Sequence, residues 1–320
     1  MGKEVRELLD SVELPVNVKL IASDEDSEAN IIAAGRDEPV VMSSLEMGEL
    51  TTVKLLVLAG SIESGRQAYE QVRGAKPAPT VIDLTGALEE QPNASLRAPI
   101  VEPPGGQTAE GIQIIAHPAA IALALFLTRL RQAGAIRNSV VEIFEPVSER
   151  GKAGIDELQK QTVALLSFKP LPKAVFDTQV SFSMAPEYGS DSRHSLGSVE
   201  LKIERHLASL LAGNGGVPMP SLRVVHAPVF HGYSISAWVE FEESPGIEAV
   251  TNALTTSNID VRTGDQEPPS NVGVAGQGGI TVGAIRADRN QARAFWFWIA
   301  ADNLRIVAEN AVEVIREALK

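Results

Sequence analysis

A continuous apolar run closed by glycine, KLLVLAG (54–60), constrains the fold of this chain more than any other segment. Strands buried on both faces of a parallel sheet have unbroken apolar sequences, and helices must then cover both faces. A helix from about Ser64 and a second apolar strand, TVIDLTG (80–86), follow it. Strands that alternate with helices in this way predict an α/β fold with a doubly wound, Rossmann-like parallel sheet.

The segments around this unit extend the alternation. Residues 2–12 carry apolar side chains at helical spacing, and VNVKLIA (16–22) is a predicted strand. Further short strands are expected near 98–101 and 112–116.

A helix over residues 118–132 is apolar on every side, so we expect it to be buried. It marks the junction between two domains. We expect residues 1–117 to form the Rossmann-like domain, rejoined by a C-terminal helix over 301–320. Residues 118–300 are expected to form an α+β domain with a mixed sheet.

The second domain shows a different pattern, with a strand at 139–147, amphipathic helices at 151–167 and 199–211, and a loop at 263–279. Two long strands, 222–230 and 233–242, are separated only by His231 and Gly232, which predicts a hairpin. The segment FWFWI (295–299) is apolar on both faces, so we expect both faces to be covered, one of them by a partner subunit.

Composition excludes several classes of function. The 320 residues contain 28 Lys and Arg against 41 Asp and Glu, a net charge of −13, which argues against nucleic-acid binding. The chain has no cysteine, which excludes disulfides, thiolate metal sites and a cysteine nucleophile. The longest strongly apolar stretch, 119–127, is about half of the ~18 residues that a membrane span needs. These features predict a cytoplasmic protein with no membrane segment and no secretory signal.

Several segments, in this order and spacing, carry a family resemblance. They are VLAGS (57–61), IDLTGAL (82–88), IIAHPAA (114–120), ERGKAGIDEL (149–158), VHAPVFHGYSISAWVEF (225–241) and ADNLRIVAENAV (301–312). Together they resemble the aspartate-semialdehyde dehydrogenase family, and its cysteine-less, usg-type paralogues more closely. N-acetyl-glutamyl-phosphate reductase shares the dimerisation domain. The resemblance implies a homodimer through the exposed face of the second domain's sheet, and it leaves an active paralogue as a further partner.

The resemblance also implies where chemistry would occur. In the family, a cysteine in the first helical turn attacks the aldehyde, hydride passes to NADP, and a histidine moves the proton. The family's Asn-Pro-Asn-Cys pattern reads His117 to Ala120 here, so Ala120 stands at the nucleophile position. The family's histidine position holds Tyr233, its substrate-binding glutamine position holds Glu145, and its substrate-binding glutamate position holds His206.

The cofactor half departs from the family as well. The segment Met1–Glu4 resembles the end of a Gly-rich, phosphate-binding turn, and the strand before it is missing. We therefore expect a natural chain that starts some tens of residues earlier. Ala59, Gly60, Ser61 and Asn303 remain as vestigial candidates for nucleotide contact.

Three hypotheses of function follow. The leading one is a catalytically silent relative that acts through dimerisation. The second is an active NAD(P)-dependent oxidoreductase of amino-acid biosynthesis in which Tyr233 donates the proton without a covalent step. The third is a binding module that uses the vestigial cleft for another metabolite.

Other candidate motifs have structural interpretations. His117, His206, His226 and His231 lack the spacing of a metal site. The segment 151–154 (GKAG) suits a closely packed helix start better than a phosphate loop.

Overall fold

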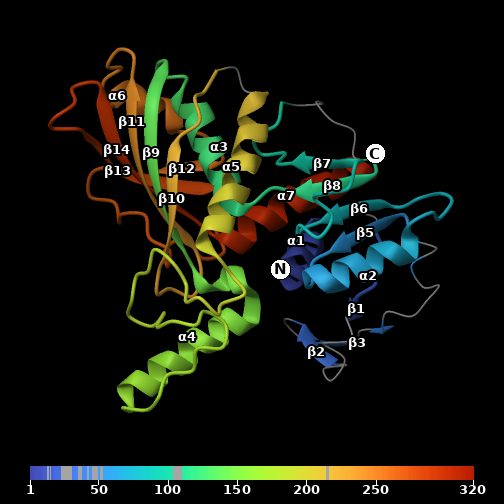
Figure 1. The fold of residues 1–320 in the computed structure, drawn as a ribbon. Helices are drawn as coiled ribbons and strands as arrows, with labels where there is room; N and C mark the ends of the chain where they lie inside the picture. Colours follow the sequence, from blue (N-terminus) through green and yellow to red (C-terminus); the bar gives the residue numbers. More distant parts are fainter. Residues whose placement is uncertain are drawn as a thin grey trace. The chain divides into compact units, whose positions relative to one another are not determined.

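The computed structural model describes residues 1–12, 14, 16–22, 31–34, 38–41, 43–44, 50, 53–103, 110–213 and 216–320. The chain divides into two compact units (Figure 1). One comprises Met1–Ala116 with Val307–Lys320, and the other comprises His117–Ile306. None of the described helices is long and apolar enough to span a bilayer.

The first unit contains the predicted parallel sheet, with strand order β5-β6-β8-β7. Its strands are β5 (Leu55–Leu58), β6 (Thr80–Asp83), β8 (Ile112–Ile115) and β7 (Ala94–Arg97), and all of its pairings are parallel. The helices of this unit are α1 (Gly2–Ser11), α2 (Ile62–Val72) and most of α7 (Asn303–Ala318). Apolar side chains of β5, β6 and β8 pack with α2 around Leu58, Val72 and Val81. The runs in β6 and β8 are buried as expected, whereas β5 is buried only at Leu58 and half-buried at its other three residues.

Two smaller sheets complete the described part of this unit. Parallel strands β1 (Ile21–Ala22) and β4 (Ser43–Ser44) form one, and antiparallel strands β2 (Ile31–Ala34) and β3 (Glu38–Val41) form the other. The strand expected over residues 16–22 is therefore paired only at its last two residues.

The strand expected near residues 98–101 was wrong in position. Pairing ends at Arg97, and residues 98–101 form a turn in which the amides of Val101 and Glu102 both donate to the Ala98 carbonyl. Pro99 explains the stop, because proline has no N–H to donate to a strand partner.

Arg97 is the largest buried polar side chain of this unit, with 1% of its surface exposed. Its guanidinium lies 2.9 Å from the Glu102 carboxylate, 2.6 Å from Glu317 on α7 and 2.9 Å from the Gln113 side-chain oxygen. These contacts join the C-terminal helix to strands β7 and β8.

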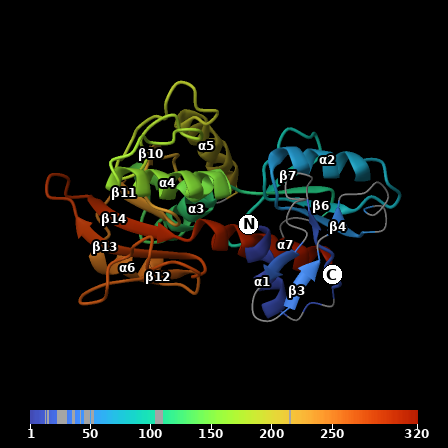
Figure 2. The same ribbon diagram turned by 90° about the horizontal axis from the view of Figure 1, so that it is seen from below.

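The second unit is built on a six-stranded mixed sheet of order β10-β9-β11-β14-β13-β12. Its strands are β9 (Ile136–Glu145), β10 (Ser221–His226), β11 (Tyr233–Phe241), β12 (Ile259–Val261), β13 (Ile280–Ala287) and β14 (Ala294–Ala301). Its helices are α3 (Pro118–Leu130), α4 (Gly151–Leu166), α5 (Leu196–Ala212) and α6 (Ile247–Leu254), with a 3₁₀ turn, η3, at Val147–Arg150. In Figure 2, α6 lies beside β12 and β13, which it contacts.

The predicted hairpin was wrong. Strand β9 lies between β10 and β11, parallel to the first and antiparallel to the second. Strand β10 ends at His226, and the following residues cross the end of β9, where the Val147 and Ser148 amides donate to the Val229 and Phe230 carbonyls at 3.0 Å. The true connection is therefore six residues long, which is enough to pass over a strand.

Helix α3 is the core of this unit, as its sequence predicts. Its residues Ala119–Leu127 are at most 1% exposed, and Phe126 meets Phe297 of β14 edge-on at 5.0 Å. The alternate residues of β11 and β14 that face α3 are buried. The opposite face stays exposed at Trp296, which is 45% accessible, so the prediction that both faces are covered holds for only one face within this chain.

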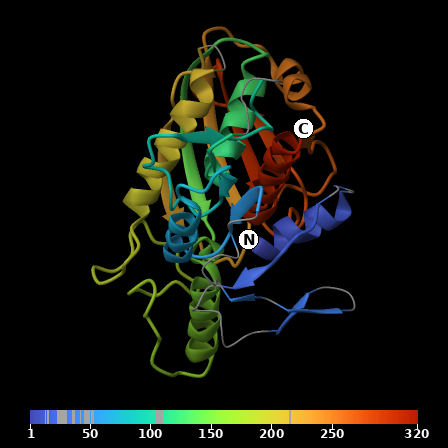
Figure 3. The same ribbon diagram turned by 90° about the vertical axis from the view of Figure 1, so that its right-hand side faces the viewer.

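Helix α4 extends beyond the end of β9 (Figure 3). The first turn of α4 packs closely against η3. A Cβ added at Gly154 would overlap the carbonyl oxygen of Val147. The segment 151–154 is thus a close-packed helix start. Helix α5 begins three residues before the helix predicted over 199–211, directly after Ser195, whose hydroxyl accepts from the Ser198 amide. Part of the glycine-rich segment after α5, residues 214–215, lies outside the described residues.

Candidate active site

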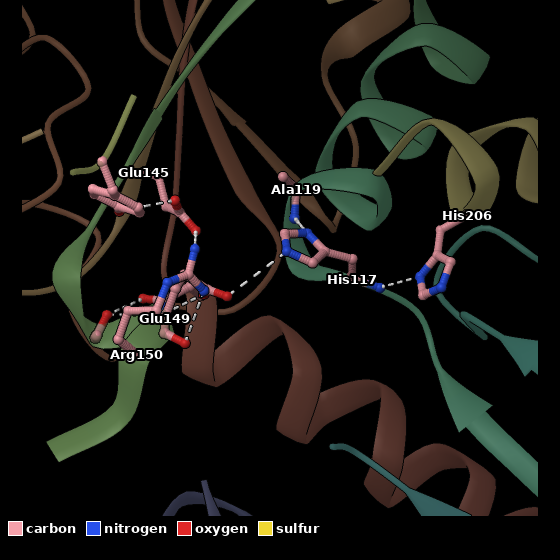
Figure 4. Close-up of polar contacts among 9 residues, drawn as sticks. His117, Ala119, Glu145, Glu149, Arg150 and His206 are labelled. Atoms are coloured by element: carbon pink, nitrogen blue, oxygen red, sulfur yellow. Dashed lines mark hydrogen bonds and ion pairs between the residues drawn. The ribbon is translucent and has the colours of Figure 1, made fainter. Parts of the chain in front are cut away.

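The N-terminus of α3 is capped by a histidine. The amide of Ala119 donates to Nδ1 of His117 at 3.3 Å, so the ring proton lies on Nε2, which points toward the Glu149 carboxylate 3.7 Å away (Figure 4). The backbone N–H of His117 donates to Nδ1 of His206 at 2.9 Å. Ala120 follows in the first helical turn with its methyl group fully buried. At the start of α3, both histidine rings therefore accept a hydrogen bond from a backbone N–H group through Nδ1.

Glu145 ends β9 in a buried ion pair. Its carboxylate is 1% exposed and lies 2.7 Å from the Arg150 guanidinium, with the Tyr188 hydroxyl 3.4 Å away. Burial raises the pKa of the Glu145 carboxyl to about 7. The nearby Glu149 charge adds to this effect, while Arg150 and the Tyr188 hydrogen bond oppose it. The Arg150 guanidinium also lies 5.9 Å from the centre of the Tyr188 ring.

A second carboxylate, Glu149, lies beside this pair. It accepts a 2.7 Å hydrogen bond from the Asn303 side-chain amide, whose oxygen accepts from the backbone N–H of Gly232 at 3.1 Å. Burial raises the pKa of the Glu149 carboxyl, and Arg150 and Asn303 oppose that shift. Two buried carboxylates thus lie near one guanidinium, which pairs directly with Glu145 and donates to the backbone carbonyl of Glu149 at 3.3 Å.

Tyr233 begins β11 next to the same group. Its ring centre lies 6.1 Å from that of His117. Among the described residues, its hydroxyl has no hydrogen-bond partner with good geometry. It nevertheless interacts with Glu149 and helps to lower the pKa of that carboxyl. Burial and the neighbouring carboxylates raise the pKa of Tyr233 well above 10, so this phenol keeps its proton.

The structure brings together five of the residues singled out from the sequence: Ala120, Glu145, His206, Tyr233 and Asn303. It adds Glu149, Arg150 and Tyr188, which the sequence reading did not select. The sequence could have pointed to Glu149 and Arg150, because both lie in the short segment between Glu145 at the end of β9 and the start of α4.

The remaining candidates lie elsewhere. Ala59, Gly60 and Ser61 form the turn between β5 and α2 in the first unit, and the Ser61 hydroxyl already accepts from the Ser64 amide at 3.1 Å. The 320 residues contain no Gly-x-Gly-x-x-Gly segment. The residues present therefore do not make a complete dinucleotide pyrophosphate grip.

The described residues contain no cluster of three or more potential metal ligands. His226 is buried, its Nε2 lies 3.2 Å from the Val180 carbonyl oxygen, and its ring centre lies 5.8 Å from those of both Phe176 and Tyr188.

A parallel α/β unit joined to a mixed-sheet unit, with a polar site at the start of a buried helix, defines a two-domain protein of the dehydrogenase type. Residues 127–306 match the family model "Semialdehyde dehydrogenase, dimerisation domain". The chain belongs to the aspartate-semialdehyde dehydrogenase family.

Relatives support this assignment over nearly the whole chain. A USG-1 protein homolog from Pseudomonas aeruginosa is 30% identical, with 95% of this chain and 90% of the relative covered. An aspartate-semialdehyde dehydrogenase from Rickettsia bellii is 33% identical over 65% of this chain and 62% of its own. The solved structure of a probable aspartate-semialdehyde dehydrogenase from Pseudomonas aeruginosa superimposes with a TM-score of 0.86 at 28% identity, covering 100% of this chain and 95% of that one.

Proposed function

We propose that this chain is a catalytically silent member of its family that acts through dimerisation, as a cytoplasmic homodimer or with an active paralogue. One observation carries the proposal: the chain has no cysteine, and the position where the resemblance places the nucleophile is the buried methyl group of Ala120. A methyl group cannot form a covalent adduct with an aldehyde. Loss of an essential nucleophile reduces turnover by a factor on the order of a million.

The surroundings of Ala120 support the same conclusion. A catalytic thiolate at a helix start depends on free N–H groups and on nearby positive charge. Here the Ala119 amide is taken by His117, and the neighbouring side chain is the carboxylate of Glu149. Arg150, which could attract an anionic substrate, is already engaged by the Glu145 carboxyl at 2.7 Å. This arrangement favours neither a thiolate nor an anion.

The test is phosphate-dependent oxidation of aspartate semialdehyde with NADP, followed by NADPH absorbance, beside an active aspartate-semialdehyde dehydrogenase measured in the same assay. We expect no rate above the no-enzyme background. A rate within about a thousandfold of the active enzyme would refute silence, because it lies far above what loss of the nucleophile leaves.

One observation favours the alternative of an NAD(P)-dependent oxidoreductase with non-cysteine chemistry. Glu145 has a pKa near neutrality, and Tyr233, which interacts with the neighbouring Glu149, keeps a protonated hydroxyl; perturbed groups of this kind gather at catalytic sites. Thermal-shift titration with NAD and NADP separates the two proposals, since a nucleotide that binds only the folded state raises the melting temperature. A shift that saturates with nucleotide supports the alternative, and no shift at millimolar nucleotide supports the silent protein.

A further inference from the structure

All three tryptophans of the chain lie on one face of the mixed sheet. Trp238 on β11 is paired directly with Trp296 on β14, and Trp298 lies two residues further along the same strand. Trp296 is 45% exposed, and Val140 on β9, which pairs with Trp238 from the other side, is 48% exposed. On the opposite face the alternate residues of β11 and β14 are buried, and Phe297 meets Phe126 of α3. The tryptophans therefore form the centre of an outer apolar surface and take no part in the core.

One carboxylate fixes two of these indoles. Oδ2 of Asp288, which follows β13, accepts the indole N–H of Trp238 at 3.0 Å and that of Trp296 at 2.7 Å. Its other oxygen accepts the backbone amides of Asn290 and Gln291 in the turn, at 2.7 and 2.9 Å. Those amides, together with the Trp296 indole, hold the pKa of Asp288 below its ordinary value. The turn thus anchors the carboxylate, and the carboxylate anchors the indoles.

We propose that Asp288 is a positioning residue for self-association: it holds Trp238 and Trp296 in their binding orientation in the free protomer, ready for the same face of a second copy. The inference rests on the dimerisation proposed above. Binding is strengthened when side chains are ordered beforehand, because less conformational entropy is lost on association. Large aromatic residues at the centre of an interface supply most of its binding energy.

The layout of the face fits a second copy of the same chain. The strands run in the order β9-β11-β14-β13, so the Trp238–Trp296 pair lies at the middle of these four. A two-fold axis parallel to the strands at that pair places β9 of one copy over β13 of the other. The exposed Glu142 on β9 and the exposed Arg286 on β13 then approach one another with opposite charge.

The experiment compares four proteins by sedimentation equilibrium and by tryptophan emission across a dilution series. In Asp288→Asn, the remaining oxygen can still cap the turn, while the amide N–H₂ faces the two indole N–H groups and cannot accept from them. Val140→Arg places a charge in the exposed face itself. Asp265→Asn, in the exposed loop before β13, is the matched control. Because every tryptophan lies on this face, the emission reports on its burial.

We expect the wild type and Asp265→Asn to form dimers of equal affinity and Val140→Arg to be monomeric. Asp288→Asn should raise the dimer dissociation constant about tenfold or more, with an unchanged far-UV spectrum. Wild-type affinity in Asp288→Asn, with Val140→Arg still monomeric, overturns the role of Asp288 and leaves the proposed dimer intact. A wild type that is monomeric, or a Val140→Arg variant that still dimerises, refutes association through this face and the inference with it.

If Asp288→Asn does not fold, Trp296→Phe provides the same test. Phenylalanine keeps an aromatic ring at the face, removes the N–H that Asp288 accepts and is smaller than the indole. We expect a weaker dimer by severalfold, and an unchanged dissociation constant would contradict the proposal.

Discussion

Replacing Glu145 by glutamine tests the electrostatics of the buried site most directly. The Glu145 carboxyl has a pKa of about 7 in the folded protein against 4.5 as its ordinary value, mainly because it is buried. Between these two pH values the folded state keeps a proton that the unfolded chain has released. The contribution of this group to the free energy of unfolding therefore falls as the pH rises through this window.

The size of the effect follows from the two pKa values. At ~1.4 kcal/mol per pH unit, ionisation of Glu145 lowers the stability of the wild type by about 2.5 kcal/mol between pH 5 and pH 8. Glutamine has no such titration. The difference in unfolding free energy, Glu145→Gln minus wild type, should therefore increase by about 2.5 kcal/mol from pH 5 to pH 8.

Urea unfolding followed by tryptophan emission measures this difference, since all three tryptophans lie in the same unit as Glu145. Protein concentration must be held constant because association stabilises the folded state. Exposed Glu187→Gln is the control and should show no change in the difference with pH. A flat difference for Glu145→Gln as well would refute the reasoning, because it would mean that Arg150 keeps the carboxylate ionised at pH 5.

Three further predictions address packing and burial. Gly154→Ala should destabilise the second unit by about 2–4 kcal/mol in urea unfolding, because its Cβ would overlap a backbone oxygen, whereas Gly197→Ala in α5 should be neutral or stabilising by up to ~1 kcal/mol. Arg97→Met should cost the first unit about 3 kcal/mol in calorimetry, because it removes the buried cation that pairs with the partly buried Glu102 and Glu317 carboxylates; Arg73→Met, in an exposed pair, should cost less than about 0.5 kcal/mol. Ala120→Cys introduces a single, fully buried thiol, which should react with a disulfide reagent at least about 100-fold more slowly in the folded protein than in urea; equal rates would contradict the burial of the α3 start.

The sequence by itself determined the elements whose pattern depends on near neighbours. The apolar run before Gly60 indicated a strand, which the structure has at Leu55–Leu58, and the all-apolar helix α3 could only be core. The alternation of Ile235, Ala237 and Val239 with more polar residues in β11 matches its buried face, because successive side chains on a strand point to opposite sides. The absence of cysteine excluded covalent thiol chemistry before any fold was known.

Only the tertiary structure decided which strands are neighbours and which charges meet. A short interval between two strands favours a hairpin locally, yet β9 takes the place between β10 and β11 because strand pairing is settled by long-range contacts. The pairing of Glu145 with Arg150, and of one aspartate with two tryptophans, likewise joins groups whose side-chain directions no local pattern fixes. Burial then sets their energies, since the free energy of a charge depends on what surrounds it in space.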